Sequence, residues 1–221
     1  MPTPEQERLR TLRSYDILHS AQEKLFDDLT ELASHIFSVP VARIAFVDGE
    51  QVWYKASKGL PARESLLPSE TLCARAVRAG EPVLVYSDLR TSSEPEAVAA
   101  LQHQIFFYAG ATLCTLQGHC IGTLCLAGHE PRQLTPAEQE VLAELAKLVM
   151  QALDTRRQLL ATAGPTAWQQ LRRQTEEELH NQMALVRYLH ARSNTHIPAP
   201  PDVLEALTKR LQDVAQVLQQ A

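Results

Sequence analysis

The sequence predicts an α+β fold, in which an antiparallel sheet is flanked by helices and followed by a C-terminal α-helical hairpin. Apolar residues recur at helical spacing over residues 1–37 and again after Thr135. The stretch between them alternates apolar and polar residues and contains two hairpin signals, at 48–50 and 117–118. Because hairpins pair their strands antiparallel and helices bracket them, we expect a sheet with helices packed on one face.

Length and composition narrow the class of protein. The chain has 221 residues, of which 45% are hydrophobic and 21% are charged, enough for one buried core plus an extension or for two small domains. A net charge of −5 without basic runs argues against nucleic acid as a partner. No stretch approaches the roughly 20 apolar residues of a membrane span, and the first residues do not resemble a signal peptide. We therefore expect a cytoplasmic protein without a membrane partner.

The first 160 residues divide into short elements with clear boundaries. Thr3 and Thr135 each precede a proline and lie three residues before Gln6 and Glu138, which is the pattern of a helix start with a capping box. Gly80 predicts the end of a short helix. The expected elements are helices at 4–15, 21–37, 71–79 and 135–160, strands at 41–47, 51–57, 83–86, 105–116 and 120–127, and a loop or short helix at 90–103.

The last sixty residues form a separate helical region. Helical spacing covers 166–192 and 202–220, and the residues between them include prolines that interrupt a helix. The second helix carries apolar residues at alternating steps of three and four, from Leu204 to Leu218, which is the narrow seam of a coiled coil. Two helices with such a seam predict either a hairpin or the arms of a dimeric bundle. We divide the chain into a domain at 1–163 and a helical extension at 164–221.

The four cysteines predict buried free thiols in a reducing compartment. A two-residue loop at 117–118 would place Cys114 opposite Ile121, whereas a loop one residue longer makes Cys114 and Cys120 diagonal neighbours about 7–8 Å apart. A disulfide needs Cβ atoms about 3.5–4.5 Å apart, so neither register favours a bridge. A redox role for one of Cys73, Cys114, Cys120 and Cys125 remains an alternative.

No pattern points to a metal site or a catalytic centre. His119, Cys125 and His129 share strand parity, but six strand residues span about 20 Å, too far for one ion. Nucleophile-elbow, zinc-protease and phosphate-loop motifs are absent from the sequence. The acidic runs at 27–28 and 176–178 are interpreted as solvated helix faces. We expect a protein that is not an enzyme.

Aromatic residues concentrate in the two hairpins. Trp53 and Tyr54 lie in the first, and Phe106, Phe107 and Tyr108 open the second. Strict alternation would place Tyr54 with Val52 and Ala56 on one face, and Trp53 with Lys55 on the other. The cluster predicts either ordinary sheet core or an apolar pocket with a few polar groups, the usual lining of a small-molecule site.

Taken in order, these segments resemble a GAF domain over about residues 5–157. The helix Thr71-Leu72-Cys73-Ala74-Arg75-Ala76-Val77 is similar to the Ser-Phe-Cys-Ala-His-Ala-Ile helix of one bacterial subgroup of sensory GAF domains. The other similar segments are 7–18, 26–33, 47–60, 107–111, 121–125 and 131–134.

The resemblance implies a six-stranded antiparallel sheet with helices on one side and a ligand pocket on the other. It points to six candidate ligand-binding residues: Trp53, Tyr54, Cys73, Asp88, Phe107 and Tyr108. The Asn-Lys-x-Phe-Asp-Glu signature of cyclic-nucleotide-binding relatives is absent, so ligand and cofactor remain unknown. The cysteine spacing also differs from that of GAF-type methionine sulfoxide reductases.

The resemblance implies a regulatory module that senses a small molecule and acts in signal transduction through its terminal helices. It further implies a homodimer and a signalling partner such as a histidine kinase. Two alternatives stay open: a dimerising scaffold with a vestigial pocket, and a cysteine-based redox sensor or enzyme.

Overall fold

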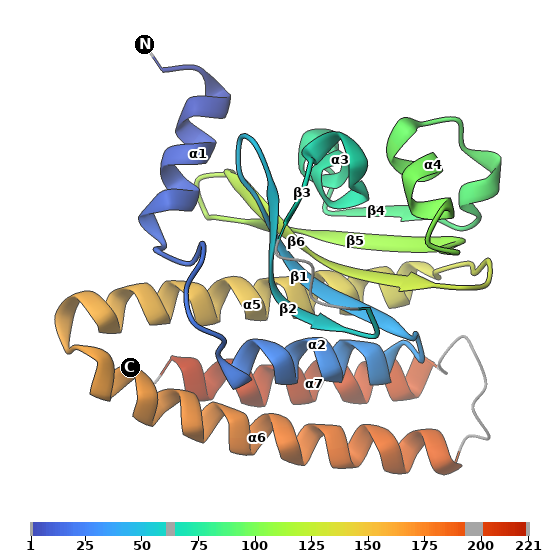
Figure 1. Cartoon of the computed structure of the whole chain (residues 1–221). Helices are drawn as coiled ribbons and strands as arrows, with labels where there is room; N and C mark the ends of the chain where they lie inside the picture. The colour runs from blue at the N-terminus through green and yellow to red at the C-terminus, as the bar shows by residue number, and fades with distance from the viewer. Residues whose placement is uncertain (1, 61–64, 193–200, 220–221) are drawn as a thin grey trace.

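A six-stranded antiparallel sheet organises the molecule (Figure 1). The structure is a computed structural model that describes residues 2–60, 65–192 and 201–219. The strands lie in the order β3-β2-β1-β6-β5-β4, and every pair is antiparallel. Their bounds are β1 Val41–Val47, β2 Val52–Lys58, β3 Ser65–Leu66, β4 Val83–Tyr86, β5 Phe107–Cys114 and β6 Cys120–Gly128.

Helices cover both faces of this sheet. On one face lie α2 (Lys24–Ile36) and α5 (Pro136–Thr162), and on the other lie α3 (Leu72–Ala79) and α4 (Pro95–Leu101) (Figure 1). The expectation of helices on one face only was therefore wrong. The reason is that β1 is buried along its whole length, so both of its faces need apolar cover. Short 3-10 turns at Pro68–Glu70 and Leu89–Thr91 flank α3 and α4.

Local capping sets the helix starts as the sequence predicted. Thr3 and Thr135 form capping boxes with Gln6 and Glu138 at the starts of α1 (Pro4–Ser14) and α5. Thr71 caps α3 through Ala74 N, and Gly80 ends that helix in the left-handed region at φ 69°. These contacts involve residues within four positions of one another, which is why the sequence shows them.

The C-terminal helices α6 (Pro165–Arg192) and α7 (Pro201–Leu218) form a hairpin that packs beneath α2 and α5 (Figure 1). The seam from Leu204 to Leu218 is buried within the chain itself, and Thr155 donates a hydrogen bond to the Leu218 carbonyl. Trp168 and the seam belong to the same hydrophobic cluster as the sheet face that α2 and α5 cover. The two predicted regions, 1–163 and 164–221, thus share one core.

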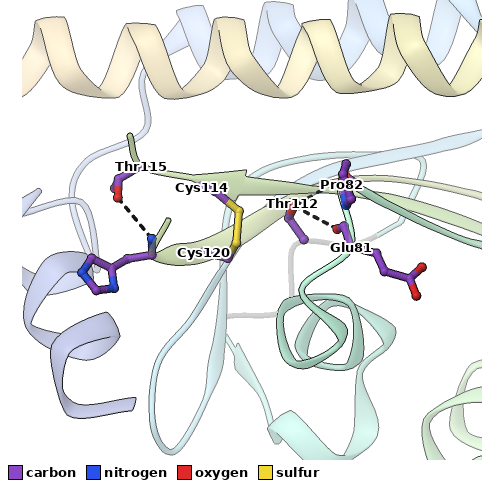
Figure 2. Close-up of a disulfide and its surroundings, with 7 residues drawn as sticks. Glu81, Pro82, Thr112, Cys114, Thr115 and Cys120 are labelled. Carbon is purple, nitrogen blue, oxygen red and sulfur yellow. Dashed lines mark hydrogen bonds between the residues drawn. A yellow bond between two sulfur atoms is a disulfide. The ribbon is translucent and has the colours of Figure 1, made fainter. Parts of the chain in front are cut away.

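A disulfide joins Cys114 to Cys120 at the turn of the β5–β6 hairpin (Figure 2). The expectation that neither register allows a bridge was wrong. The pairing shifts between Leu113 and Cys114, so the two cysteines lie directly opposite one another, with Cα atoms 3.9 Å apart. Thr115 N also donates to the His119 carbonyl, so residues 116–118 form the connection and Cys114 faces Cys120 directly instead of diagonally.

A second register shift reorients the first hairpin. Ile44 pairs with Ala56, but the next residue, Ala45, pairs with Tyr54, so Lys55 is an extra residue in β2. Ala56 therefore packs in the helix-side cluster instead of on the face of Tyr54, contrary to the predicted alternation. The bulge also leaves Lys55 completely buried beside α2.

Candidate functional site

A cavity of about 310 Å³ lies between the sheet and the pair α3 and α4. Residues of β1, β2, β5 and β6 form its floor, and α3 with α4 forms its roof. Most of its lining is apolar, as is usual for small-molecule sites. Its polar lining residues are Arg43, Tyr54, Glu70, Thr71, Gln102, His103 and Tyr108.

Arg43 brings a positive charge to this otherwise apolar floor. It lies in β1, its guanidinium group sits 4.5 Å from the centre of the Tyr54 ring, and its Nε donates to Ser57 Oγ at 2.9 Å. Such an arrangement is a cation–π contact, which is stronger when both groups are removed from water. Burial, followed by the nearby Cys73 and Cys125 thiols, raises the pKa of Tyr54, so its hydroxyl stays neutral.

Two thiols meet at the base of the cavity. Cys73 in the first turn of α3 and Cys125 in β6 have their Sγ atoms 3.6 Å apart and share a hydrogen bond. Both are free thiols and both are buried. The hydrogen bond from Cys125 lowers the pKa of Cys73 to about 7 against the opposing effect of burial, and nearby Thr123 and Tyr108 add to it. The same hydrogen bond raises the pKa of Cys125 well above its usual value.

The hydroxyl groups of Tyr108 and Thr123 lack hydrogen-bond partners among the described residues, although both are buried. A Cβ atom on Gly110 would come within 2.3 Å of the Tyr108 hydroxyl, so glycine leaves the space that this hydroxyl occupies. A buried polar group without a partner costs roughly 1–3 kcal/mol. Both hydroxyls lie near the Cys73 thiol, and Tyr108 also lines the cavity, so a bound molecule or water could pair with the Tyr108 hydroxyl.

A buried charge cluster lies on the opposite face of the sheet and links it to the helices. Glu23, at the start of α2, accepts from Lys55 Nζ at 3.0 Å, from Arg156 Nε at 2.9 Å and from Trp168 Nε1 at 2.8 Å. These partners come from β2, α5 and α6. Burial would raise the pKa of Glu23, but the Lys55 charge, the Trp168 hydrogen bond and Arg156 together lower it.

The family model of the GAF domain matches residues 19–154. The chain belongs to the GAF domain family. Within the matched range lie the whole sheet, the cavity and most of α5. GAF domains are typical of signal-sensing modules.

A curated relative of this GAF domain protein is a cyclic di-GMP phosphodiesterase of Pseudomonas aeruginosa. The two are 30% identical over 187 residues, which cover 82% of this chain and 32% of the relative. The chain therefore spans about a third of the length of that relative.

Solved structures confirm the GAF fold. The free methionine-R-sulfoxide reductase of Neisseria meningitidis matches with a TM-score of 0.52 at 16% identity, over 72% of this chain and 95% of that one. A domain from Sinorhizobium meliloti, described as part of a two-component sensor histidine kinase protein, matches with a TM-score of 0.51 at 16% identity. The match covers 64% of this chain and 97% of that one. The blue-light-absorbing PixJ GAF domain of Thermosynechococcus elongatus matches with a TM-score of 0.50 at 16% identity. The match covers 71% of this chain and 94% of that one.

The GAF cavity brings together three of the six candidate ligand-binding residues. Tyr54, Cys73 and Tyr108 line it. Trp53 and Phe107 each precede one of these tyrosines in a strand, so they point to the opposite face of the sheet. There they pack in the hydrophobic cluster beneath α2 and α5. Asp88 lies outside the cavity lining; it caps the 3-10 turn and pairs with Arg90.

Sequence reasoning did not select Arg43, Cys125 or Thr123 as part of one site. Arg43 had a usable signal, because an arginine inside the otherwise apolar strand VARIAFV must find buried partners. Cys125 and Cys73 are 52 positions apart, and nothing local to either indicates that they meet.

Within residues 2–60, 65–192 and 201–219, no group of three or more metal-ligating side chains comes together. In the same part of the chain, no helix has the length and apolar character needed to cross a membrane.

Proposed function

We propose that this GAF domain is a non-enzymatic sensor that binds a small molecule in the cavity beneath α3 and α4. The observation that carries the proposal is Tyr108, which lines the cavity and whose buried hydroxyl has no hydrogen-bond partner among the described residues. Arg43 adds a positive charge at the floor. A ligand of about 310 Å³ or less, largely apolar and with a hydrogen-bond acceptor, fits these features.

The proposed signal leaves the cavity through β2. Tyr54 lines the cavity, and the next residue, Lys55, is bound to Glu23 on the other face of the sheet. Glu23 in turn binds Arg156 of α5 and Trp168 of α6. A shift of β2 on ligand binding would therefore change the position of the helices at the C-terminal end of the domain.

The same helices are the proposed route to a partner. Helices α5, α6 and α7 pack together on one side of the sheet. A second copy of the chain, or a signalling enzyme such as a kinase or phosphodiesterase, could pack against them. The phosphodiesterase relative is compatible with this proposal at the level of signalling. Light scattering on the full chain tests the homodimer: a monomer at all concentrations would contradict it.

Ligand binding is tested by native mass spectrometry of freshly purified full-length protein, followed by thermal shift against small-molecule libraries. We expect a bound mass or a stabilising compound whose affinity falls about tenfold in Tyr108→Phe, the loss of one buried hydrogen bond of roughly 1.4 kcal/mol. Tyr188→Phe, on the exposed side of α6, should leave affinity unchanged. If no compound binds, or if both variants bind equally well, the cavity is vestigial and the protein is a scaffold.

A further inference from the structure

We propose that Cys73 and Cys125 form a reversible dithiol–disulfide couple, oxidised by a small hydroperoxide that enters the cavity. The two Sγ atoms already lie 3.6 Å apart, and both side chains line the cavity. They come from different elements, α3 and β6, so a bond between them would tie the roof of the cavity to its floor.

The geometry requires little movement. A disulfide has an S–S length of about 2.05 Å, so the sulfur atoms must approach by about 1.5 Å, a change within reach of side-chain rotation. The helix and strand that carry them are packed against each other, and Cys73, Ala74, Val77 and Cys125 belong to one buried cluster. The backbone therefore holds the two thiols together in the reduced state.

The surroundings distinguish the two sulfurs. The pKa of Cys73 is near 7, because the hydrogen bond with Cys125, the nearby Thr123 and Tyr108 hydroxyls and the Arg43 charge favour its thiolate, although burial opposes them. Near neutral pH, Cys73 is thus the nucleophilic thiolate more often than an ordinary thiol is. Cys125 keeps its proton, since its pKa is raised well above the usual value. Cys73 is therefore the attacking group and Cys125 the resolving one.

The reaction balances with a hydroperoxide ROOH as the oxidant. The Cys73 thiolate attacks the terminal oxygen, the O–O bond breaks, and the alkoxide takes a proton and leaves as ROH. Cys73 is then a sulfenic acid. The Cys125 sulfur, losing its proton, attacks Cys73 Sγ and displaces hydroxide, which leaves as water. Two thiols are oxidised to one disulfide while ROOH is reduced to ROH and water.

Oxidation would alter the sensor itself, a consequence that rests on the proposed function. The new bond would remove two thiols from the lining and draw Cys73 toward β6, close to the unpartnered Tyr108 hydroxyl. Ligand affinity should differ between the reduced and oxidised forms. Oxidation itself needs no ligand, so it can be tested whether or not a ligand is found.

The test isolates this pair from the Cys114–Cys120 disulfide. Cys114→Ser/Cys120→Ser leaves two of the four cysteines, Cys73 and Cys125. With one equivalent of hydrogen peroxide, we expect the thiol count in denaturant to fall from two to zero and dithiothreitol to restore it. If the double variant does not fold, peptide mapping of the wild-type protein without reduction reports the same Cys73–Cys125 bond.

Single substitutions in that background test the roles of the two sulfurs. Cys125→Ser should stop at a sulfenic acid that dimedone traps on Cys73, whereas Cys73→Ser should be oxidised at least about tenfold more slowly at pH 7. The wild-type rate should rise with pH to a midpoint near 7. The proposal is overturned if thiols persist, if only disulfides between chains form, or if the two single variants react at equal rates.

Discussion

Replacing Glu23 by Gln should destabilise the fold by several kcal/mol, far more than the same change elsewhere on α2. Glu23 forms ion pairs with two buried cations: Lys55, whose side chain is 0% exposed, and Arg156, whose side chain is 10% exposed. Glutamine keeps the shape of the side chain but not its charge. Lys55 and Arg156 would then remain buried without the carboxylate that pairs with both of them.

The magnitude follows from the burial of the cluster. Removing one partner of a buried ion pair costs about 3–5 kcal/mol, because the remaining charge has lost both water and its partner. For a chain of this size, each kcal/mol lowers Tm by about 2–4 °C, so Glu23→Gln should lower it by roughly 6–20 °C. Trp168→Phe removes one hydrogen bond to a charged group and should cost about 1.5–3 kcal/mol.

Glu31→Gln is the matched control. Glu31 also lies on α2 and pairs with Lys58 and Arg187, but its side chain is 38% exposed. Exposed pairs contribute about 0–1 kcal/mol, so this variant should unfold near the wild-type midpoint. Urea unfolding followed by circular dichroism measures all three variants. Equal midpoints for Glu23→Gln and Glu31→Gln would refute the reasoning that burial makes the Glu23 cluster important.

Three further predictions concern stability. Gly122→Ala should lower the free energy of unfolding by at least about 3 kcal/mol or prevent folding, because its Cβ would meet the Ala45 carbonyl oxygen at 2.1 Å. The control Gly49→Ala, whose Cβ would have only Leu9 Cδ1 nearby, at 3.5 Å, should change it by no more than about 0.5 kcal/mol in the same unfolding assay. Opening the Cys114–Cys120 disulfide with a reductant should lower stability by about 2 kcal/mol, the entropy of so short a loop, and a melting curve that is identical with and without reductant would contradict this. The folded pKa of Glu23 lies below its ordinary value, so its contribution to the free energy of unfolding is complete above about pH 4.5 and is lost as pH falls through the folded pKa. Glu23→Gln should therefore lose less stability than the wild type between about pH 5 and pH 3. Parallel curves of stability against pH for the two proteins would contradict this.

The elements of the fold were largely predictable from sequence, and the candidate site was predictable in part. Tyr54, Cys73 and Tyr108 were selected from sequence and do line the cavity. Trp53 and Phe107 were selected with them because aromatic clustering does not report which face a strand residue takes. Adjacent positions in a strand point to opposite faces, so half of any such cluster lies away from a one-sided cavity.

Two register shifts in the sheet account for most of the differences between the structure and what the sequence predicted. The shift between Ile44 and Ala45 inserts Lys55 into β2 and turns Ala56 toward the helices, and the shift between Leu113 and Cys114 makes the disulfide possible. A bulge is stabilised by what packs around it, and the partner of Lys55 is Glu23, 32 positions away. No local pattern indicates such a partner.

By itself, the sequence determined the helices, five of the six strands, their order, the capping boxes at Thr3 and Thr135, and the family, whereas β3 was not predicted. These depend on contacts within a few residues or on a pattern read along the chain. Only the tertiary structure decided that Cys73 meets Cys125, that Glu23 binds Arg156 and Trp168, and that the C-terminal hairpin packs on the domain. Each of these pairs groups that are distant in sequence, because burial is a property of the folded chain and not of any one segment.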